Sequence, residues 1–398
     1  MRFAEGRSNL LKEQVQLDSY NVVVVGAGPA GSTSAALLAR AGIDVLLVAA
    51  GDFSQPRPAE VLPPATVRLL SKLGLPSPQK GCGAIACRGI LSAWSSLKPE
   101  FFDYELYTCS AGVTVDRRFF DLDLAASAVK ANARLMKGGR LCRAEIRGRD
   151  RWDLLIKQAG RLISVQADFL IEAVGRKGSF SALSQRGRTF YDRLVAVVIP
   201  HVGPAADDGL LLLEAGPGGW WYSSRGDPQT ASVVYLTDAD LLPSAPVARS
   251  QHLKDAYANT RLIQDLLGTV PDFQVHRVID ARTSRRTVVG DRWLAIGDAA
   301  FANDPLCGAG IRFALVSAEK ASRAVAAFVY DDKPQVLEEY ATWFASEVAG
   351  QLRSKQSVYG SVRSELHPGM FWNRRFNPFP TPRSGISTGK TIPRTCRS

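Results

Sequence analysis

The first clear pattern along the chain, from residue 22, is that of buried strands. Residues 22–25 form an uninterrupted valine run, residues 32–40 have the spacing of a helix, and residues 43–48 are again mostly apolar. Continuous apolar runs of this kind are typical of parallel strands that are covered on both faces. The order of strand, helix and strand therefore predicts a parallel α/β layer at the start of the chain.

The pattern changes in the middle of the chain, where short apolar and β-branched runs follow one another between turns and predict an antiparallel sheet. These runs lie at 194–199, 209–214, 219–223 and 231–236, after strand-like runs at 141–146, 152–157 and 162–166. Helical spacing predicts helices at 65–73, 119–135, 246–267, 308–328 and 334–363. The difference between the two regions predicts two domains.

The first valine run leads into a glycine-rich turn. Gly26, Gly28 and Gly31 have the spacing G-x-G-x-x-G. Glycines at these positions permit a tight turn and let backbone N–H groups approach a pyrophosphate at a helix N-terminus. The spacing alone is a weak indicator of nucleotide binding, because it occurs in many folds.

A second turn of this type lies near the end of the chain. The strand-like run at 293–296 ends in Gly297-Asp298, and Asp304-Pro305 and Gly308-Ala309-Gly310-Ile311 follow. Two glycine-rich strand-to-helix turns, one of them carrying an acid that we expect to be buried, suit a long cofactor that is held at both ends. Together the two turns predict FAD.

These turns belong to four motifs whose order resembles the single-component FAD monooxygenases of the p-hydroxybenzoate hydroxylase type and the neighbouring tryptophan-halogenase-like branch. The other two are 115–121, similar to a D-R-x-x-F-D helix start, and 169–176, similar to a strand ending in A-T-G-R. The resemblance covers roughly residues 21–375. It implies hydroxylation of an electron-rich aromatic ring through a flavin C4a-hydroperoxide, with NAD(P)H as reductant and O2 as oxidant.

The patterns and the resemblance together predict an α/β fold with a Rossmann-like FAD-binding domain, an antiparallel β-sheet substrate domain and C-terminal helices. We assign residues 21–80, 116–190 and 270–335 to the FAD-binding domain. Residues 81–115 and 191–269 form the predicted substrate domain, and residues 336–398 form a C-terminal helical region with a basic tail.

The resemblance also implies roles for individual residues. The implied cofactor-binding residues are Gly26, Gly28, Ala30, Gly31, Ala49, Arg117, Gly175, Asp298, Gly308, Ala309, Gly310 and Ile311. The implied catalytic residues are Glu60, Pro305 and Gly310, and the expected substrate-lining residues are Trp94, Trp220 and Tyr222, whose rings can enclose a planar substrate. Three alternatives stay open: Arg117 in an ion pair with Asp116 or Asp121, Glu60 as a solvated loop acid, and the aromatic residues as simple core.

The end of the second strand departs from the dinucleotide pattern. This position usually carries an acid that accepts hydrogen bonds from the adenosine ribose, but here the strand ends in Ala49-Ala50. Asp52 or a water molecule would have to replace the acid. Because a hydrogen bond to a charged group contributes about 1.5–3 kcal/mol, we expect FAD to bind weakly.

The aromatic residues narrow the resemblance within the family. The chain resembles the flavoproteins of tryptophylquinone cofactor biogenesis at Trp94, residues 219–223 and Phe371-Trp372. Those flavoproteins hydroxylate a tryptophan in a precursor polypeptide. A halogenase is disfavoured, because the chain lacks a W-x-W-x-I-P element and has no lysine between Gly81 and Ser96. The alternatives are a tailoring hydroxylase of a small aromatic metabolite, an isoprenoid double-bond reductase, and an inactive flavin-binding assembly factor.

The net charge is +11, and it is uneven. Residues 366–398 contain no acid, and their basic residues are Arg374, Arg375, Arg383, Lys390, Arg394 and Arg397. Because a patch of one sign speeds association with the opposite sign, the tail predicts docking of an acidic polypeptide substrate; a solvated terminus is the alternative. No nucleic-acid-binding motif is present, so we expect no nucleic-acid partner.

Composition limits the location and the cofactors. A content of 46% hydrophobic and 22% charged residues is ordinary for a soluble enzyme. No apolar run reaches the roughly 20 residues that span a bilayer, and the N-terminus lacks the apolar core of a signal peptide, so we expect a cytoplasmic protein with no membrane partner. The cysteines and histidines have no zinc spacing, so no metal site is expected. The sequence does not determine the oligomeric state.

Overall fold

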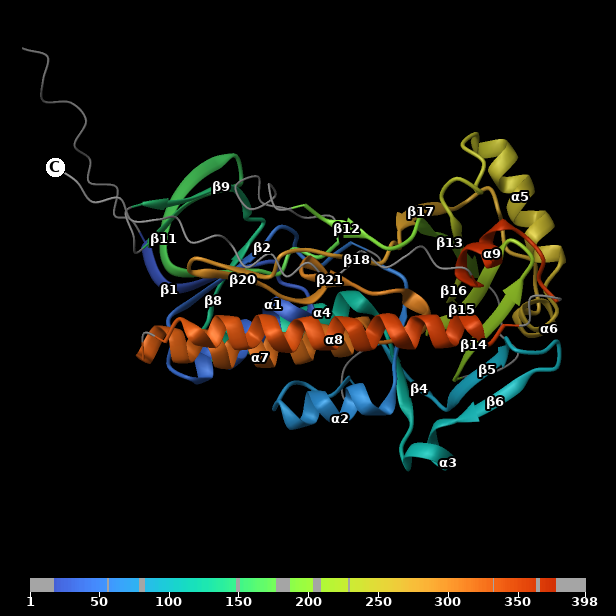
Figure 1. Ribbon diagram of the computed structural model, residues 1–398, viewed down its shortest axis with the longest axis horizontal. Helices are drawn as coiled ribbons and strands as arrows, with labels where there is room; N and C mark the ends of the chain where they lie inside the picture. Colours follow the sequence, from blue (N-terminus) through green and yellow to red (C-terminus); the bar gives the residue numbers. More distant parts are fainter. Residues whose placement is uncertain are drawn as a thin grey trace, which may run out of the picture.

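The computed structural model describes residues 18–55, 57–78, 83–147, 151–176, 187–202, 209–227, 230–331, 333–362 and 366–376. Two large sheets lie in different halves of the molecule, and smaller sheets lie between and beside them (Figure 1). Helix α8 (Gln335–Gly360) runs from the first half to the second and contacts the short helix α9 (Met370–Phe376). This long helix therefore connects both halves.

The first large sheet is the predicted α/β layer. Its strand order is β19-β20-β11-β1-β2-β8, and β10 and β9 extend it from β11. The strands are β1 (Asp18–Val25), β2 (Val45–Ala49), β8 (Arg134–Lys137), β9 (Arg140–Arg147), β10 (Arg151–Gln158), β11 (Arg161–Glu172), β19 (Val289–Gly290) and β20 (Trp293–Ala295). The five central strands from β20 to β8 are parallel, whereas β9, β10 and β19 pair antiparallel.

The valine run explains the position of β1 in the middle of this sheet. Val22, Val23 and Val24 are completely buried, and burial of such a side chain contributes about 1.5–3 kcal/mol. Helix α1 (Pro29–Arg40) contacts both α4 (Arg117–Lys130) and α7 (Gly310–Asp331). The carboxyl ends of the parallel strands thus come together at one edge, where open α/β sheets bind ligands.

The second large sheet has the order β17-β13-β16-β15-β14-β5-β6. Its strands are β5 (Gly89–Ala93), β6 (Glu100–Asp103), β13 (Leu194–Val202), β14 (Leu210–Gly216), β15 (Gly219–Asp227), β16 (Thr230–Asp238) and β17 (Arg277–Asp280). All neighbouring pairs are antiparallel except β14 and β5, which are parallel. This sheet is the predicted antiparallel layer with one parallel pair added.

Both faces of the second sheet are covered. On β15, Trp220 belongs to a cluster with Trp94 and Trp372, beside α8 and α9. Its neighbour Trp221 belongs to a separate cluster with Tyr257, under α5 (Pro246–Ala258) and α6 (Leu262–Leu267). Because successive strand residues face opposite ways, cover on both sides explains why apolar and polar residues alternate poorly here.

Two three-stranded sheets and several short elements complete the fold. One sheet has the order β3-β7-β4 and the other β12-β18-β21. The strands are β3 (Glu60–Leu62), β4 (Ala84–Cys87), β7 (Gly112–Val115), β12 (Thr189–Phe190), β18 (Ser284–Arg285) and β21 (Phe301–Ala302). The remaining elements are α2 (Pro64–Lys72), α3 (Tyr104–Thr108) and the 3-10 turns η2 (Gly297–Ala299) and η3 (Pro305–Cys307).

The predicted fold class is confirmed, and the differences are local. The predicted helix at 119–135 begins earlier, where Asp116 caps the N–H of Arg118. It ends at Lys130, because Asn132 adopts a φ of 75° and the chain turns into β8. The predicted helix at 246–267 is two helices with a break at 259–261. The domain boundaries stay a prediction.

The described parts of the chain contain neither a membrane-spanning helix nor a metal-binding cluster. No helix there has the length and apolar character that crossing a membrane requires. No group of three His, Cys, Asp or Glu side chains in those residues is placed to hold a metal ion.

Candidate functional site

The glycine-rich turn between β1 and α1 contains two kinds of glycine. Gly26 has a φ of +111°, and a Cβ there would lie 2.2 Å from the carbonyl oxygen of Ala173. A Cβ on Gly31 would lie 1.8 Å from the carbonyl oxygen of Gly26. The turn itself therefore requires these two glycines. Gly28 is different, because a Cβ there would meet no atom within 4 Å.

The space beside Gly28 fits a phosphate group. Gly28 precedes α1, and no side chain caps this helix, whose first residue is Pro29. A helix N-terminus carries free N–H groups and the positive end of the helix dipole, which together bind anions. The turn thus fits the FAD diphosphate, which the backbone N–H groups of Ala30 and Gly31 would hold.

Asp298 lies next to this turn. Its side chain is 31% exposed, and its Oδ2 is 3.1 Å from Nε of Arg176. The preceding Gly297 has a φ of +56°, and a Cβ there would lie 2.8 Å from the Cβ of Ala30. The structure therefore brings together the two predicted cofactor motifs, and it leaves Asp298 accessible enough to accept from a cofactor hydroxyl.

The segment from Pro305 to Ile311 continues from Asp298 into α7. The buried Asp304 caps this segment, because its Oδ1 accepts from the N–H of Leu306 at 3.0 Å. Gly308 has a φ of +57°, and a Cβ on Gly308 or Gly310 would meet no atom within 4 Å. Open backbone at the start of a 22-residue helix is suited to stabilise negative charge on a flat ring.

Cys307 lies in the same segment, and its thiol is neutral. Burial and the nearby Asp304 charge raise the pKa of Cys307 to about 12. The thiolate is the nucleophilic form of cysteine. Cys307 therefore contributes no nucleophile near neutral pH.

Arg117 binds two carboxylates. Its Nη1 is 2.9 Å from Oε1 of Glu60, and its Nε is 2.9 Å from Oδ1 of Asp121. Burial alone would lower the pKa of Arg117, but Glu60 and Asp121 raise it above the ordinary value. The structure thus shows the ion pair with Asp121 that was the alternative for Arg117, and it adds Glu60. Contact of Arg117 with FAD stays a prediction.

Glu60 also connects the cofactor side to the second large sheet. Burial and the Glu60 charge both raise the pKa of Tyr222, on β15. The backbone next to Glu60 is fixed to the same strand, because Ser224 Oγ donates to the carbonyl of Ala59 at 3.2 Å. The predicted catalytic acid and one predicted substrate residue therefore lie close together, and the Tyr222 phenol stays protonated.

Trp94 and Trp220 are 7% and 1% exposed. Trp94 Nε1 donates to the carbonyl of Val358 at 2.9 Å, and Trp220 Nε1 donates to the hydroxyl of Tyr359 at 3.1 Å. Their ring centroids are 6.0 Å apart in an edge-to-face arrangement. Core packing, the alternative for these residues, is what the structure shows, and their contact with a substrate stays a prediction.

The ends of β2 and β11 lie at the same edge of the sheet. Ala49 is buried, and its carbonyl accepts from the N–H of Gly139 at 2.9 Å. The exposed Asp52 accepts from both Ser54 N and Ser54 Oγ, which lowers the pKa of Asp52. At the end of β11, Gly175 has a φ of +74° with open space beside it. Replacement of the ribose acceptor by Asp52 stays a prediction.

Two buried charged groups were not predicted. Glu172 is 3.3 Å from Nη1 of Arg286, and burial raises the pKa of Glu172 to about 7 against the opposing charges of Arg286 and Arg188. Lys355, on α8, is bonded to Asp192 and lies 3.4 Å from Asp304. The burial of Glu172 could have been predicted, because this acid stands at the end of an apolar strand. The burial of Lys355 could not, because a single lysine in an amphipathic helix gives no such signal.

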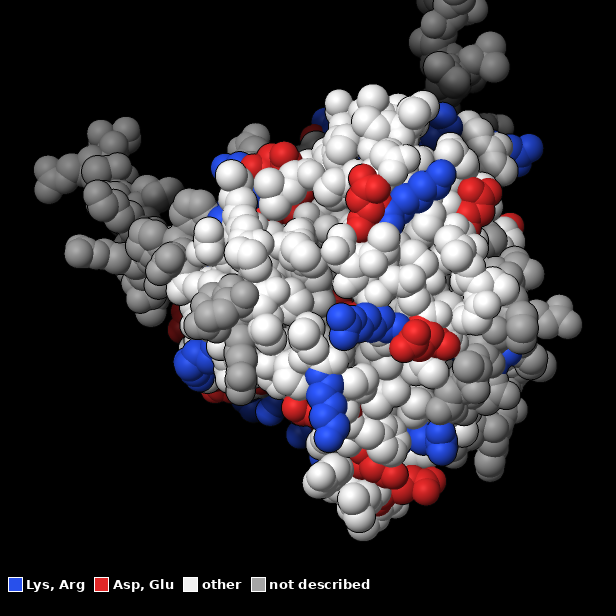
Figure 2. All heavy atoms as spheres, turned by 90° about the vertical axis from the view of Figure 1, so that its right-hand side faces the viewer, with Lys and Arg blue, Asp and Glu red and all other residues white. Residues whose placement is uncertain are grey.

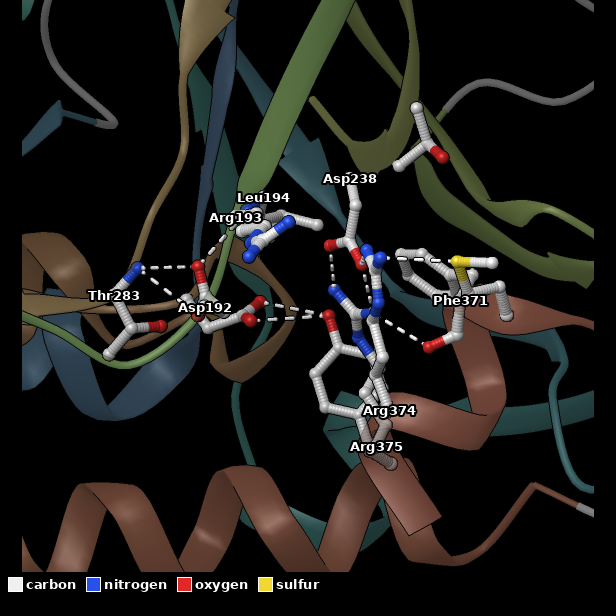
Figure 3. Close-up of polar contacts among 12 residues, drawn as sticks. Asp192, Arg193, Leu194, Asp238, Thr283, Phe371, Arg374 and Arg375 are labelled. Carbon is white, nitrogen blue, oxygen red and sulfur yellow. Dashed lines mark hydrogen bonds and ion pairs between the residues drawn. The ribbon is translucent and has the colours of Figure 1, made fainter. Parts of the chain in front are cut away.

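The first two arginines of the basic tail are paired within the chain. Figure 3 shows Arg374 and Arg375 of α9 pointing at Asp238. Arg374 also binds Asp240, and the Arg375 guanidinium lies 3.4 Å from the ring centroid of Phe371. These two charges are therefore not available as a steering patch. The other basic tail residues, Arg383, Lys390, Arg394 and Arg397, lie outside the described residues.

Comparison with known families agrees with this geometry. The family described as FAD binding domain matches residues 19–352. The matched segment contains both glycine-rich turns, Asp298 and Arg117.

Individual relatives are similar over most of their length. LodB of Marinomonas mediterranea, which carries the name of an FAD-dependent oxidoreductase, is 28% identical over 368 residues, 90% of this chain and 97% of LodB. The flavin-dependent halogenase CmlS has a TM-score of 0.81 at 23% identity, over 92% of this chain and 68% of its own. The peptidyl tryptophan dihydroxylase QhpG has a TM-score of 0.72 at 22% identity, over 90% and 79%. These two structures show a shared fold.

The two kinds of glycine predict different effects of the same substitution. Gly28→Ala should leave the unfolding temperature of the apoprotein unchanged but raise the FAD dissociation constant about tenfold or more, because the methyl group enters the phosphate space. Gly26→Ala should lower the unfolding temperature itself, since the clash is internal. Calorimetry of the apoproteins and fluorescence titration with FAD measure both. Equal FAD affinity in Gly28→Ala and wild type would contradict the site.

Asp298→Ala should abolish retention of FAD during purification while leaving a folded apoprotein. Arg176 keeps its bonds to the carbonyls of Arg282 and Asn303, so the local backbone remains supported. Visible absorbance and far-UV circular dichroism of the purified variant test this, with the exposed Asp331→Ala as control. A yellow Asp298→Ala protein with normal flavin content would place the ribityl contact elsewhere.

Proposed function

The chain belongs to the FAD-binding domain family, and we propose that it is an FAD-dependent hydroxylase that acts on a tryptophan side chain in a precursor polypeptide. The observation that carries the proposal is that β3, which begins at Glu60, contacts β15, which carries Tyr222, while Arg117 holds the Glu60 carboxylate. Similarity to LodB over nearly the whole of both chains, and the fold shared with a peptidyl tryptophan dihydroxylase, support it.

Bound FAD would supply the redox chemistry. NAD(P)H would provide two electrons, and O2 would provide one oxygen atom for the aromatic ring of the substrate and one for water. The chain supplies binding, orientation and electrostatics. The Gly28 turn would bind the diphosphate, Asp298 would orient the ribityl chain, and the N-terminus of α7 would stabilise negative charge on the flavin ring. The open backbone at Gly308 and Gly310 allows the ring to approach.

The residues beyond the ring would bind the substrate. Glu60 would serve as an acceptor, and the protonated Tyr222 on the neighbouring strand β15 would serve as a donor. Trp94 and Trp220 are buried, the ring centroids of Trp220 and Tyr222 are 6.0 Å apart, and both indole N–H groups are bonded within the protein. Buried aromatic side chains on this side of Tyr222 would keep water away from the reacting ring.

The reaction is tested by the mass of the product. The enzyme with FAD, NAD(P)H and isotopically labelled O2 should add one or two labelled oxygen atoms to a tryptophan in the unmodified precursor of a quinoprotein subunit. Free indole, under the same conditions, should react slowly. Addition of two hydrogen atoms to an isoprenoid would instead show a reductase. Fast turnover of free indole or a phenol would favour a small-metabolite hydroxylase, and no product with any substrate would contradict the proposal.

We also propose that the basic tail attracts an acidic polypeptide substrate. Figure 2 shows lysine and arginine side chains interleaved with acids at the end of the molecule that holds the second sheet, so this face has no patch of one sign. Among the basic residues of the tail, Arg374 and Arg375 are paired internally. Long-range attraction by the tail would therefore rest on Arg383, Lys390, Arg394 and Arg397.

This proposal predicts a response to salt. Hydroxylation of the polypeptide should slow as salt rises, because the Debye length falls from about 10 Å at 0.1 M to about 3 Å at 1 M. Replacing Arg383, Lys390, Arg394 and Arg397 by Gln should reproduce the effect of high salt with unchanged FAD affinity. Stopped-flow association kinetics measure it. Salt-independent association of the wild type would contradict a steering role.

A further inference from the structure

A buried lysine lies where the two halves of the molecule meet. Lys355 is only 12% exposed. Its Nζ donates to the carboxylate of Asp192 and, at 2.8 Å, to the hydroxyl of Thr283, and it lies 3.4 Å from Oδ2 of Asp304. One ammonium group on α8 thus binds three separate segments.

Two of those three segments connect the two halves. Asp192 lies between β12 and β13, where the chain enters the second sheet, and Thr283 lies between β17 and β18, where it returns. The two crossings are also bonded to each other, since Thr283 N donates to Asp192, as Figure 3 shows, and Tyr191 N donates to the carbonyl of Thr283. Asp304 caps the segment that carries Pro305.

The charges in this cluster require a cation. Asp304 is completely buried and Asp192 is 11% exposed. Burial alone would lower the pKa of Lys355 and raise that of Asp192. The carboxylates of Asp304 and Asp192 outweigh burial and raise the pKa of Lys355, and the Lys355 ammonium lowers the pKa of Asp192. Without the ammonium, two carboxylates would remain in a poorly hydrated space, where like charges repel strongly.

Other donors hold the carboxylates, but none of them in the described residues joins all three segments. Asp304 accepts from the hydroxyl of Tyr359 at 3.2 Å and from Leu306 N, and Asp192 accepts from Leu194 N and Thr283 N. Tyr359 bonds Asp304 but not Asp192, and Thr283 N joins the two crossings without Asp304. Lys355 is therefore the group that spans Asp192, Thr283 and Asp304 together.

We propose that Lys355 is a positioning residue, which fixes the second sheet at a set distance from the Pro305–Ile311 segment and so aligns substrate with flavin. In this role Lys355 acts through Asp192, Thr283 and Asp304 and not through contact with substrate or flavin. The proposal rests on the proposed function, because alignment matters only if the segment carries the flavin ring and the sheet carries the substrate. A misplacement of the reacting groups by about 1 Å can lower the rate up to about 100-fold. A side chain that holds the two halves together at this position therefore has a large effect on the rate.

Lys355→Met keeps an unbranched side chain, one atom shorter than that of Lys, and removes the charge and the hydrogen-bond donors. With the polypeptide substrate, we expect about tenfold less hydroxylated product per NAD(P)H oxidised, and a KM within about twofold of wild type. The visible circular dichroism of bound flavin should change as well. Lys333→Met is the matched control, because Lys333 is half exposed and pairs with Asp331 just before α8. It should behave as wild type.

A double variant separates positioning from charge balance. Lys355→Met should lower the unfolding temperature, because it leaves the carboxylates of Asp192 and Asp304 without their cation. Lys355→Met/Asp192→Asn removes the surplus negative charge and should recover most of this stability. The double variant also provides a folded protein if Lys355→Met is unstable. If Lys355 positions the sheet, the product yield per NAD(P)H stays low in the double variant. Recovery of the yield together with stability would overturn the proposal, as would wild-type yield in Lys355→Met.

Failure of the proposed function would look different. In that case wild type itself would give no hydroxylated product. The visible circular dichroism of bound flavin would then be the remaining test of the role of Lys355. A changed visible circular dichroism in both Lys355 variants, but not in Lys333→Met, would still support a tie between the junction and the flavin. An unchanged spectrum in both would overturn it.

Discussion

The close contact between the turn at Gly297 and the first turn of α1 is the constraint on which the candidate site depends. A Cβ on Gly297 would lie 2.8 Å from the Cβ of Ala30, so nothing larger than glycine fits there. The contact exists because β1, β11 and β20 are parallel neighbours whose carboxyl ends share one edge. Backbone N–H groups of one turn and the carboxylate of the next can therefore meet a single extended ligand.

The sequence predicted those parts of the site in which a local pattern has a single physical explanation. The valine run at 22–25 and the glycines at 26 and 31 follow from burial and from close backbone approach. Partners that lie far apart in the chain were not predictable. Trp220 meets Tyr359 through a hydrogen bond across 139 positions, and no local pattern distinguishes that arrangement from an open aromatic cavity.

Charged residues were the least predictable part of the structure. Arg374 and Arg375 look like the start of a solvated basic tail, but Asp238 and Asp240 neutralise them. Lys355 looks like one of many surface lysines on an amphipathic helix, but three chain segments enclose it. A charge pattern gives the sign of a region, whereas the partner of each charge depends on tertiary contacts.

The candidate site requires one FAD molecule that extends from Gly28, past Asp298, to the Pro305–Ile311 segment. The decisive measurement is a crystal structure of the protein grown with FAD. The diphosphate should lie within hydrogen-bonding distance of the N–H groups of Ala30 and Gly31, and the flavin ring should lie beside Gly308 and Gly310. A bound FAD with its diphosphate away from α1, or its ring away from α7, would show that the site lies elsewhere.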